Sequence, residues 1–207
     1  MTDNYRIYYN NALVLISKDT PQSNKKFTKV ISDTKEIAQF TANPVIFYDG
    51  LTNENVLILA AEPELVLSDF LEHQEIILAG GGIVWNEKDE LLMIHRRGHW
   101  DLAKGKIERN EKIVDGAMRE VEEETGVKIK SVEETAIHTY HAYKLKGRNC
   151  IKETSWYVMK AKEDQNKLVP QTEEDIEDVR WVKRTDLSKY KEGCYPLIWD
   201  LIEQFQQ

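Results

Sequence analysis

Residues 105–127 read Gly-Lys-Ile-Glu-Arg-Asn-Glu-Lys-Ile-Val-Asp-Gly-Ala-Met-Arg-Glu-Val-Glu-Glu-Glu-Thr-Gly-Val, and the later part of this stretch predicts a helix. Asn110 is the expected N-cap, Glu111 places a negative charge at the positive end of the helix dipole, and Gly126 stands where a C-terminal cap belongs. Apolar residues recur at helical spacing and predict one face packed on a core: Ile113, Val114, Ala117, Met118 and Val121.

The opposite face of this helix concentrates negative charge. Glu120, Glu123 and Glu124 share one side of about one turn, near the end where the helix dipole disfavours negative charge. Arg119 can relieve their repulsion in part. Most glutamate runs are simply solvated helix faces. This arrangement also suits Mg²⁺ or Mn²⁺, which bind a few carboxylates together with waters and substrate phosphates.

The spacing decides between these interpretations. The stretch resembles the Nudix box: Gly, five residues, Glu, seven residues, Arg-Glu, an aliphatic residue, any residue, Glu-Glu, any residue, Gly, an aliphatic residue. With average residue usage, a chance match is on the order of one in 10⁹ per starting position. The chain meets every fixed position: Gly105, Glu111, Arg119, Glu120, Val121, Glu123, Glu124, Gly126 and Val127.

This resemblance extends more loosely over Ile76–Gln207 and implies the Nudix α/β/α sandwich around a mixed sheet, of the α/β (α+β) class. Residues 1–75 lie outside it. Their apolar runs and turn residues predict a small α/β N-terminal domain of unknown role, with strands at Tyr5–Tyr9 and Ala12–Ile16. The expected domains are therefore residues 1–75 and residues 76–207.

The resemblance also implies the chemistry. Nudix enzymes hydrolyse a nucleoside diphosphate linked to another group, by attack of water on phosphorus. Glu120, Glu123 and Glu124 would hold the metal, joined by the backbone carbonyl of Gly105. Glu111 and Arg119 would orient the glutamates. Non-catalytic Nudix-fold modules, the rival class, usually lack one or more of these glutamates.

A strand precedes the box and ends in basic residues. Ile76–Trp85 is the predicted strand, and its glycines at 80–82 do not open a helix, so they favour close backbone packing or a bulge over a dinucleotide loop. After the next strand, Leu91–Ile94, come Arg96 and Arg97. These arginines are either a solvated strand end or a guanidinium grip on phosphate.

The lead-in Trp100–Lys106 resembles that of several Nudix subgroups, including the dinucleoside polyphosphate and diphosphoinositol hydrolases. Ala103 stands where those subgroups usually have proline. Lys104 and Lys106 are candidate ligands for substrate phosphates. Tyr143 lies seventeen residues after Gly126, near the base-stacking tyrosine of the dinucleoside polyphosphate enzymes.

A general base is also expected outside the box, since many Nudix enzymes take it from the loop before the last sheet strand. That loop here carries Glu173 and Glu174, which are either solvated or catalytic, and Glu120 is the next candidate. The predicted catalytic set is therefore Glu120, Glu123, Glu173, Glu174 and Arg119.

The expected substrate is a dinucleoside polyphosphate such as diadenosine tetraphosphate. ADP-ribose, a nucleotide sugar or a (d)NTP is the alternative. Hydrolysis of RNA caps or 5′ ends is disfavoured, because the formal net charge of the 207 residues is −8 and no basic, aromatic-rich face is evident.

Composition and charge limit the remaining choices. Hydrophobic residues make up 41% of the chain, enough for a packed core. Two cysteines without metal spacing, no signal-peptide pattern and no apolar run near ~18 residues predict a cytoplasmic protein without a membrane partner. The last helix, starting at Pro196, has an apolar stripe for core packing or for a homodimer.

Overall fold

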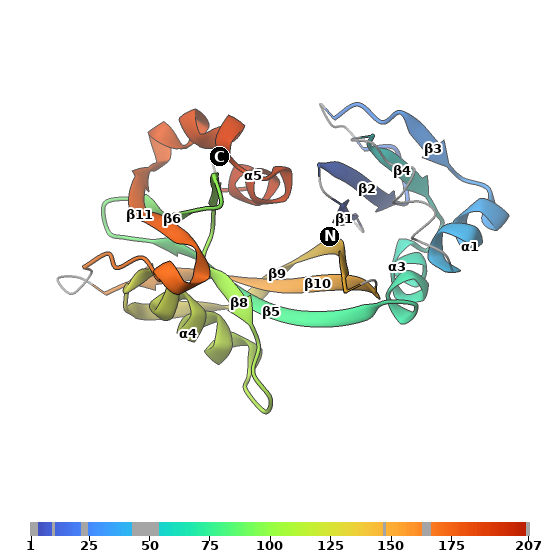
Figure 1. The fold of residues 1–207 in the computed structure, drawn as a ribbon. Coiled ribbons are helices and arrows are strands. Elements are labelled where there is room, and N and C mark those ends of the chain that lie inside the picture. The colour runs from blue at the N-terminus through green and yellow to red at the C-terminus, as the bar shows by residue number, and fades with distance from the viewer. Residues whose placement is uncertain are drawn as a thin grey trace. The chain divides into compact units, whose positions relative to one another are not determined.

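The computed structural model describes residues 4–9, 11–21, 25–42, 54–146, 148–162 and 167–205 (Figure 1). Two compact units are present: Met1–Ile77 with Thr139–Glu153, and Leu78–His138 with Thr154–Gln207. Two long strands, β9 (Ile129–Leu145) and β10 (Arg148–Ala161), contribute residues to both units. In the described ranges, no helix is long and apolar enough to cross a membrane.

In its described residues, the N-terminal unit is a small sheet with two helices. Its elements are β1 (Tyr5–Tyr9), β2 (Ala12–Ser17), β3 (Lys29–Ile31), α1 (Thr34–Ala42), β4 (Val56–Leu59) and α3 (Pro63–Glu72). The strand order is β9-β1-β2-β4-β3. Strands β1 and β2 form the expected antiparallel pair, and β2, β3 and β4 run parallel.

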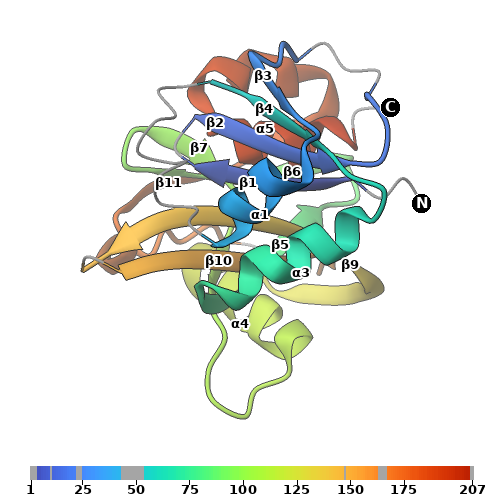
Figure 2. The same ribbon diagram turned by 90° about the vertical axis from the view of Figure 1, so that its right-hand side faces the viewer.

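Helices α1 and α3 lie together across the sheet of this unit (Figure 2). Asp33 caps α1, because its Oδ1 accepts the backbone N–H groups of Lys35 and Glu36 at 2.9 and 3.1 Å. Phe40 of α1 stacks on Phe70 of α3 with ring centroids 5.1 Å apart. The apolar run Val45–Tyr48, also expected from the sequence, falls outside the described residues.

The second unit contains the box. Its remaining elements are β5 (Glu75–Trp85, whose first residues belong to the other unit), β6 (Glu90–Arg96), β7 (His99–Asp101), β8 (Lys104–Lys106), α4 (Ile113–Thr125), η1 (Thr172–Glu174), β11 (Ile176–Lys183), η2 (Arg184–Gly193) and α5 (Pro196–Glu203). Its strands follow the order β11-β6-β5-β10-β9, with β7 paired to β6 and β8 to β5.

Alternating residues of β5 and β6 face two separate cores. Ile83, Leu91 and Met93 pack with η2 and α5, as members of a cluster that includes Leu187, Ile198 and Leu201. Val84, Leu92 and Ile94 pack with Ala117 and Val121 of α4. Successive residues of a strand point to opposite faces of the sheet, so the two clusters lie on opposite faces. Helices cover both sides of this sheet (Figure 1). The predicted α/β/α sandwich is confirmed.

The glycines of β5 allow α4 to approach the sheet closely. A Cβ added at Gly80 would lie 2.9 Å from the Ala117 Cβ, and one at Gly82 would lie 2.6 Å from a Val121 methyl group. Any larger residue would force the helix away. The glycines therefore serve close packing, one of the two roles expected for them.

For the box helix, the predicted N-cap is wrong and the predicted C-cap is right. Helix α4 begins at Ile113, and Asn110 instead adopts a left-handed turn conformation with φ +68°. Asparagine tolerates a positive φ, so Asn110 is suited to a left-handed turn as well as to an N-cap position. At the other end, Gly126 has φ +76° and donates its N–H to the Glu122 carbonyl, as expected of a C-cap.

Candidate active site

A single guanidinium organises the carboxylates of α4. Arg119 donates from Nε and Nη2 to the two oxygens of Glu111, at 2.9 and 3.0 Å. Its Nη1 donates to Glu120 Oε1 at 2.7 Å and to Glu123 Oε2 at 2.9 Å. Nη2 also donates to the Lys106 carbonyl at 3.2 Å, which ties the helix to β8. Arg119 thus offsets the repulsion that the glutamate spacing creates.

Glu111 is the fixed partner in this group. The Arg119 guanidinium, followed by the Glu108 backbone N–H, holds the pKa of the Glu111 carboxyl at about 2. Both donors prefer the ionised form, and the fork geometry of arginine matches the two oxygens. Glu111 is therefore charged throughout the neutral range and orients Arg119, the role that the resemblance implies for it.

Glu120 lies directly against the backbone of β8. Gly105 pairs with Gly80 of β5, and a Cβ built at position 105 would lie 1.8 Å from Glu120 Oε2. Glycine alone leaves room for this carboxylate. Burial raises the pKa of Glu120, and the nearby Arg119 opposes that shift only in part.

Glu124 is the most enclosed carboxylate of the helix. It is 2% exposed, its Oε2 accepts the Lys104 backbone N–H at 2.9 Å, and its Oε1 lies 3.7 Å from Arg96 Nη1. Burial raises its pKa to about 7, against the opposing positive charges of Lys104 and Arg96. This carboxylate is short of positive charge in the structure as it stands.

These donors fit a divalent cation by their chemistry. Glu120 and Glu124 supply hard oxygen ligands, and their raised pKa values show that burial penalises their negative charge, which Mg²⁺ or Mn²⁺ would offset. Among the residues that the structure describes, no three Asp, Glu, His or Cys side chains already converge as a metal site. Arg119 instead holds Glu120 and Glu123, so its contacts would have to rearrange.

The predicted phosphate ligands fall in different surroundings. Lys104 Nζ donates to Asp101 at 2.5 Å and lies 5.8 Å from the centroid of the Trp156 ring. Lys106 is exposed on β8. Arg97 pairs with Asp175 on the surface, where both side chains are more than half exposed. Of the four predicted cations, Arg96 and Lys104 contact or neighbour the enclosed Glu124.

The sequence argument missed Asp101. It is 5% exposed and holds both the Leu102 backbone N–H, at 2.8 Å, and the Lys104 ammonium. An acidic residue between two large apolar ones, Trp100 and Leu102, was the available signal, because a charge that is buried with such neighbours needs a partner.

The two loop glutamates differ in what they contact. Arg96 Nη2 donates to Glu174 Oε2 at 2.9 Å, and the charge of Glu174 contributes to the raised pKa of Glu120. Glu173, also in η1, is exposed. The structure therefore brings Glu174 toward the α4 carboxylates. Tyr143 belongs to the other compact unit, with its ring 5.7 Å from His141, and its base-stacking role stays a prediction.

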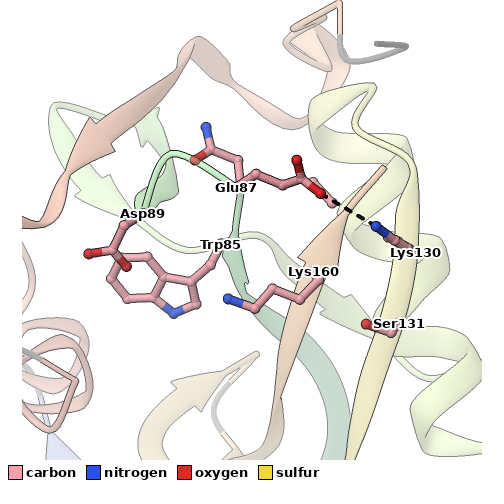
Figure 3. Close-up of a pocket in the computed structure, with 8 residues that line it drawn as sticks. Trp85, Glu87, Asp89, Lys130, Ser131 and Lys160 are labelled. Atoms are coloured by element: carbon pink, nitrogen blue, oxygen red, sulfur yellow. Dashed lines mark hydrogen bonds and ion pairs between the residues drawn. The ribbon is translucent and has the colours of Figure 1, made fainter. Parts of the chain in front are cut away.

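A separate cavity of about 440 Å³ lies at the opposite end of β5 and β6 from Arg96 (Figure 3). Glu87 and Lys130 pair across it at 3.4 Å. Its lining residues are Trp85, Asn86, Glu87, Asp89, Lys130, Ser131, Lys160 and Ala161. None of them belongs to the predicted site.

A comparison with known protein families identifies the family of this chain. The model of the NUDIX domain matches residues 77–199, more than half of the chain. The chain belongs to the Nudix family. It is accordingly a Nudix hydrolase, an enzyme that acts on phosphoric anhydrides, and the rival class of non-catalytic modules is set aside.

Solved structures agree with this fold. The MutT Nudix hydrolase from Burkholderia pseudomallei is 20% identical, with a TM-score of 0.50 over 63% of this chain and 98% of that one. A mutator MutT protein from Bacillus halodurans is 22% identical (TM-score 0.49; 63% and 82% covered), and a C. elegans Ap4A hydrolase is 20% identical (TM-score 0.47; 62% and 94% covered). At this identity, the first of these likenesses establishes the Nudix fold alone.

We expect Gly105→Ala to impair hydrolysis with little loss of stability. The new methyl group displaces the flexible end of Glu120 rather than backbone, so kcat should fall on the order of 10²-fold. Gly193→Ala is the matched control, since its Cβ meets only the Trp100 ring at 3.1 Å. Steady-state kinetics and thermal unfolding of both variants provide the check. An unchanged kcat in Gly105→Ala would contradict the assigned contact.

Glu111 should stabilise the fold in a pH-dependent manner. Its folded pKa of about 2 lies below the ordinary value of 4.5, so its stabilisation is complete above the ordinary value and is lost as the pH falls toward about 2. The difference in unfolding free energy between wild type and Glu111→Gln should therefore shrink between about pH 6 and pH 3. Urea titrations measure this difference in unfolding free energy. Glu108→Gln, which changes an exposed side chain, is the control variant. A constant difference would count against the ion pair.

Proposed function

We propose that this Nudix hydrolase cleaves a dinucleoside polyphosphate such as diadenosine tetraphosphate, with Mg²⁺ or Mn²⁺ as cofactor. The observation that carries the proposal is the position of two carboxylates, Glu120 and Glu124, directly against strand β8, which carries the two cations Lys104 and Lys106. So much positive charge beside one metal site suits a phosphate chain longer than a single diphosphate. The Trp100–Lys106 lead-in, which resembles that subgroup, supports the same choice.

Each residue of the proposed site would have a separate role. Glu120, Glu123 and Glu124, with the Gly105 carbonyl, would hold the divalent ion, which when bound neutralises the diphosphate and acidifies water. Arg119 would release Glu120 and Glu123 toward that ion while Glu111 keeps the guanidinium in place. Lys104 and Lys106 would bind phosphate oxygens, Lys104 by exchanging its contact with Asp101.

Glu174 is our choice for the group that accepts the proton of the attacking water. Its charge acts on Glu120, and Arg96 holds it on the same side of the fold as Glu124. Glu173 and Glu120 are the alternatives, and kcat for Glu173→Gln and Glu174→Gln separates them, because loss of the base should cost on the order of 10²-fold.

Glu124→Gln tests the metal site. Its neutral side chain still accepts the Lys104 N–H but cannot supply a negative charge, so kcat should fall at least about 10²-fold. Because burial disfavours the charged carboxyl, the metal-free variant should be at least as stable as wild type at pH 8.

The same variant gives a readout that does not depend on turnover. Mn²⁺ should raise the melting temperature of wild type in a concentration-dependent manner and that of Glu124→Gln much less. Lys189→Gln, which removes one exposed surface charge, is the control. Full activity of Glu124→Gln, or of wild type in excess EDTA, would refute the proposed site.

The substrate follows from a comparison of kcat/KM for diadenosine tetraphosphate, ADP-ribose and dATP, with Mg²⁺ and with Mn²⁺. The proposal expects the first to be preferred, and Tyr143→Ala to lower kcat/KM selectively for it, since loss of base stacking costs about 1–3 kcal/mol. A preference of about tenfold or more for ADP-ribose or dATP would overturn the choice. Equal losses on all three in Tyr143→Ala would show that the ring serves packing.

A further inference from the structure

Three consecutive basic residues at the end of β6 pair with an acidic segment that precedes and begins β11. The pairs are His95 Nδ1 with Glu177 Oε2 at 2.9 Å, Arg96 Nη2 with Glu174 Oε2 at 2.9 Å, and Arg97 Nη2 with Asp175 Oδ2 at 2.7 Å. The segment is therefore fixed to β6 by side chains as well as by the β6–β11 ladder.

Arg96 differs from its two neighbours in reaching a second carboxylate, since Nη1 lies 3.7 Å from Glu124 Oε1. Its side chain is 21% exposed, close to the 26% of His95 and far below the 64% of Arg97. Glu124 is enclosed on α4, whereas Glu174 is about half exposed on η1. One guanidinium thus connects a helix on one side of the site with the loop on the other.

The backbone around Glu174 is irregular. Thr172–Glu174 form one 3₁₀ turn, Asp175 has φ +61°, and the register of β11 on β6 shifts between Ile176 and Asp178. A left-handed conformation at a non-glycine residue is strained, and bulges commonly re-aim a side chain. Such a segment keeps a single conformation when contacts with neighbouring elements restrain it.

Part of that hold comes from the end of α4. Val169 N–H donates to the Thr125 carbonyl at 2.8 Å, and Gln171 N–H donates to the Glu124 carbonyl at 3.2 Å. These bonds satisfy carbonyl groups of the last helical turn and fix the chain three residues before Glu174. They do not reach the carboxylate itself, which Arg96 contacts.

We propose that Arg96 is a positioning residue that holds the Glu174 carboxylate beside the carboxylates of α4, rather than a ligand of substrate phosphate. This inference rests on the proposed function in one respect, that Glu174 takes part in hydrolysis. A guanidinium presents two Nη donors at fixed angles and so spans two carboxylates, which a single ammonium group cannot do in the same geometry.

The same contacts argue against a phosphate role for Arg96. Moving it toward a phosphate would leave Glu124, a carboxylate almost without solvent access, with one positive neighbour fewer. A buried charge deprived of its partner is strongly unfavourable. Lys106, which is exposed, can meet an incoming phosphate without that cost.

Hydrogen–deuterium exchange of the metal-free protein tests the positioning directly. In Arg96→Gln, peptides that cover residues 171–177 should exchange at least about fivefold faster than in wild type, because a local restraint is lost. Arg96→Lys, which keeps the charge, should be as stable to unfolding as wild type but should still show the faster exchange of this segment. In Lys189→Gln, the surface-charge control, the segment should exchange as in wild type. Unchanged exchange of residues 171–177 in Arg96→Gln would overturn the proposal. The measurement needs no substrate.

Kinetics on the preferred diphosphate substrate test the consequence. Arg96→Gln should lower kcat about as much as Glu174→Gln does, with KM within about threefold of wild type, and the double variant should lose little more than either one. A raised KM with unchanged kcat, or multiplicative losses in the double variant, would identify a phosphate ligand instead. If wild type hydrolyses no diphosphate, the proposed function fails, while the exchange result still decides whether Arg96 positions the loop.

Discussion

The ion pairs of Arg119 are the interaction on which the site depends. Three glutamates of the box meet this one guanidinium, and without it Glu120 and Glu123 would face each other across less than a helical turn. Like charges at this spacing destabilise a helix. Arg119 also donates to the Lys106 carbonyl, so the charge group and the strand β8 are held as one piece. The placement of the glutamates and the local stability of the helix therefore depend on the same contacts.

Close packing of α4 makes those contacts reach the sheet. Gly80 and Gly82 let the helix lie against β5, and Gly105 leaves space for the Glu120 carboxylate against β8. A side chain at any of these positions would meet atoms nearer than 3 Å. Small residues at a helix–sheet contact set the distance between elements, and this distance fixes where the carboxylates stand.

The distribution of charge then separates the glutamates by environment. Glu111 is held ionised by strong donors, whereas burial raises the pKa of Glu120 and of Glu124. Groups of one chemical type thus have different affinities for protons, as divided roles in a site require. Asp101 and Arg96 complete this arrangement, one by holding Lys104 and the other by connecting Glu124 to Glu174.

The sequence by itself determined the helix, its apolar face, its C-cap at Gly126, the family and the glutamates of the box, because these depend on residue type and spacing along one element. The family resemblance carried by that spacing also implied the α/β/α sandwich of the second unit. The N-cap at Asn110 was wrong, because Asn110 suits a left-handed turn as well as a cap. Only the tertiary structure decided that Arg119 meets three carboxylates, that Glu174 rather than Glu173 approaches α4, and that Asp101 holds Lys104. Such pairings join residues up to 78 positions apart, as Arg96 and Glu174 are, and are set by how elements pack.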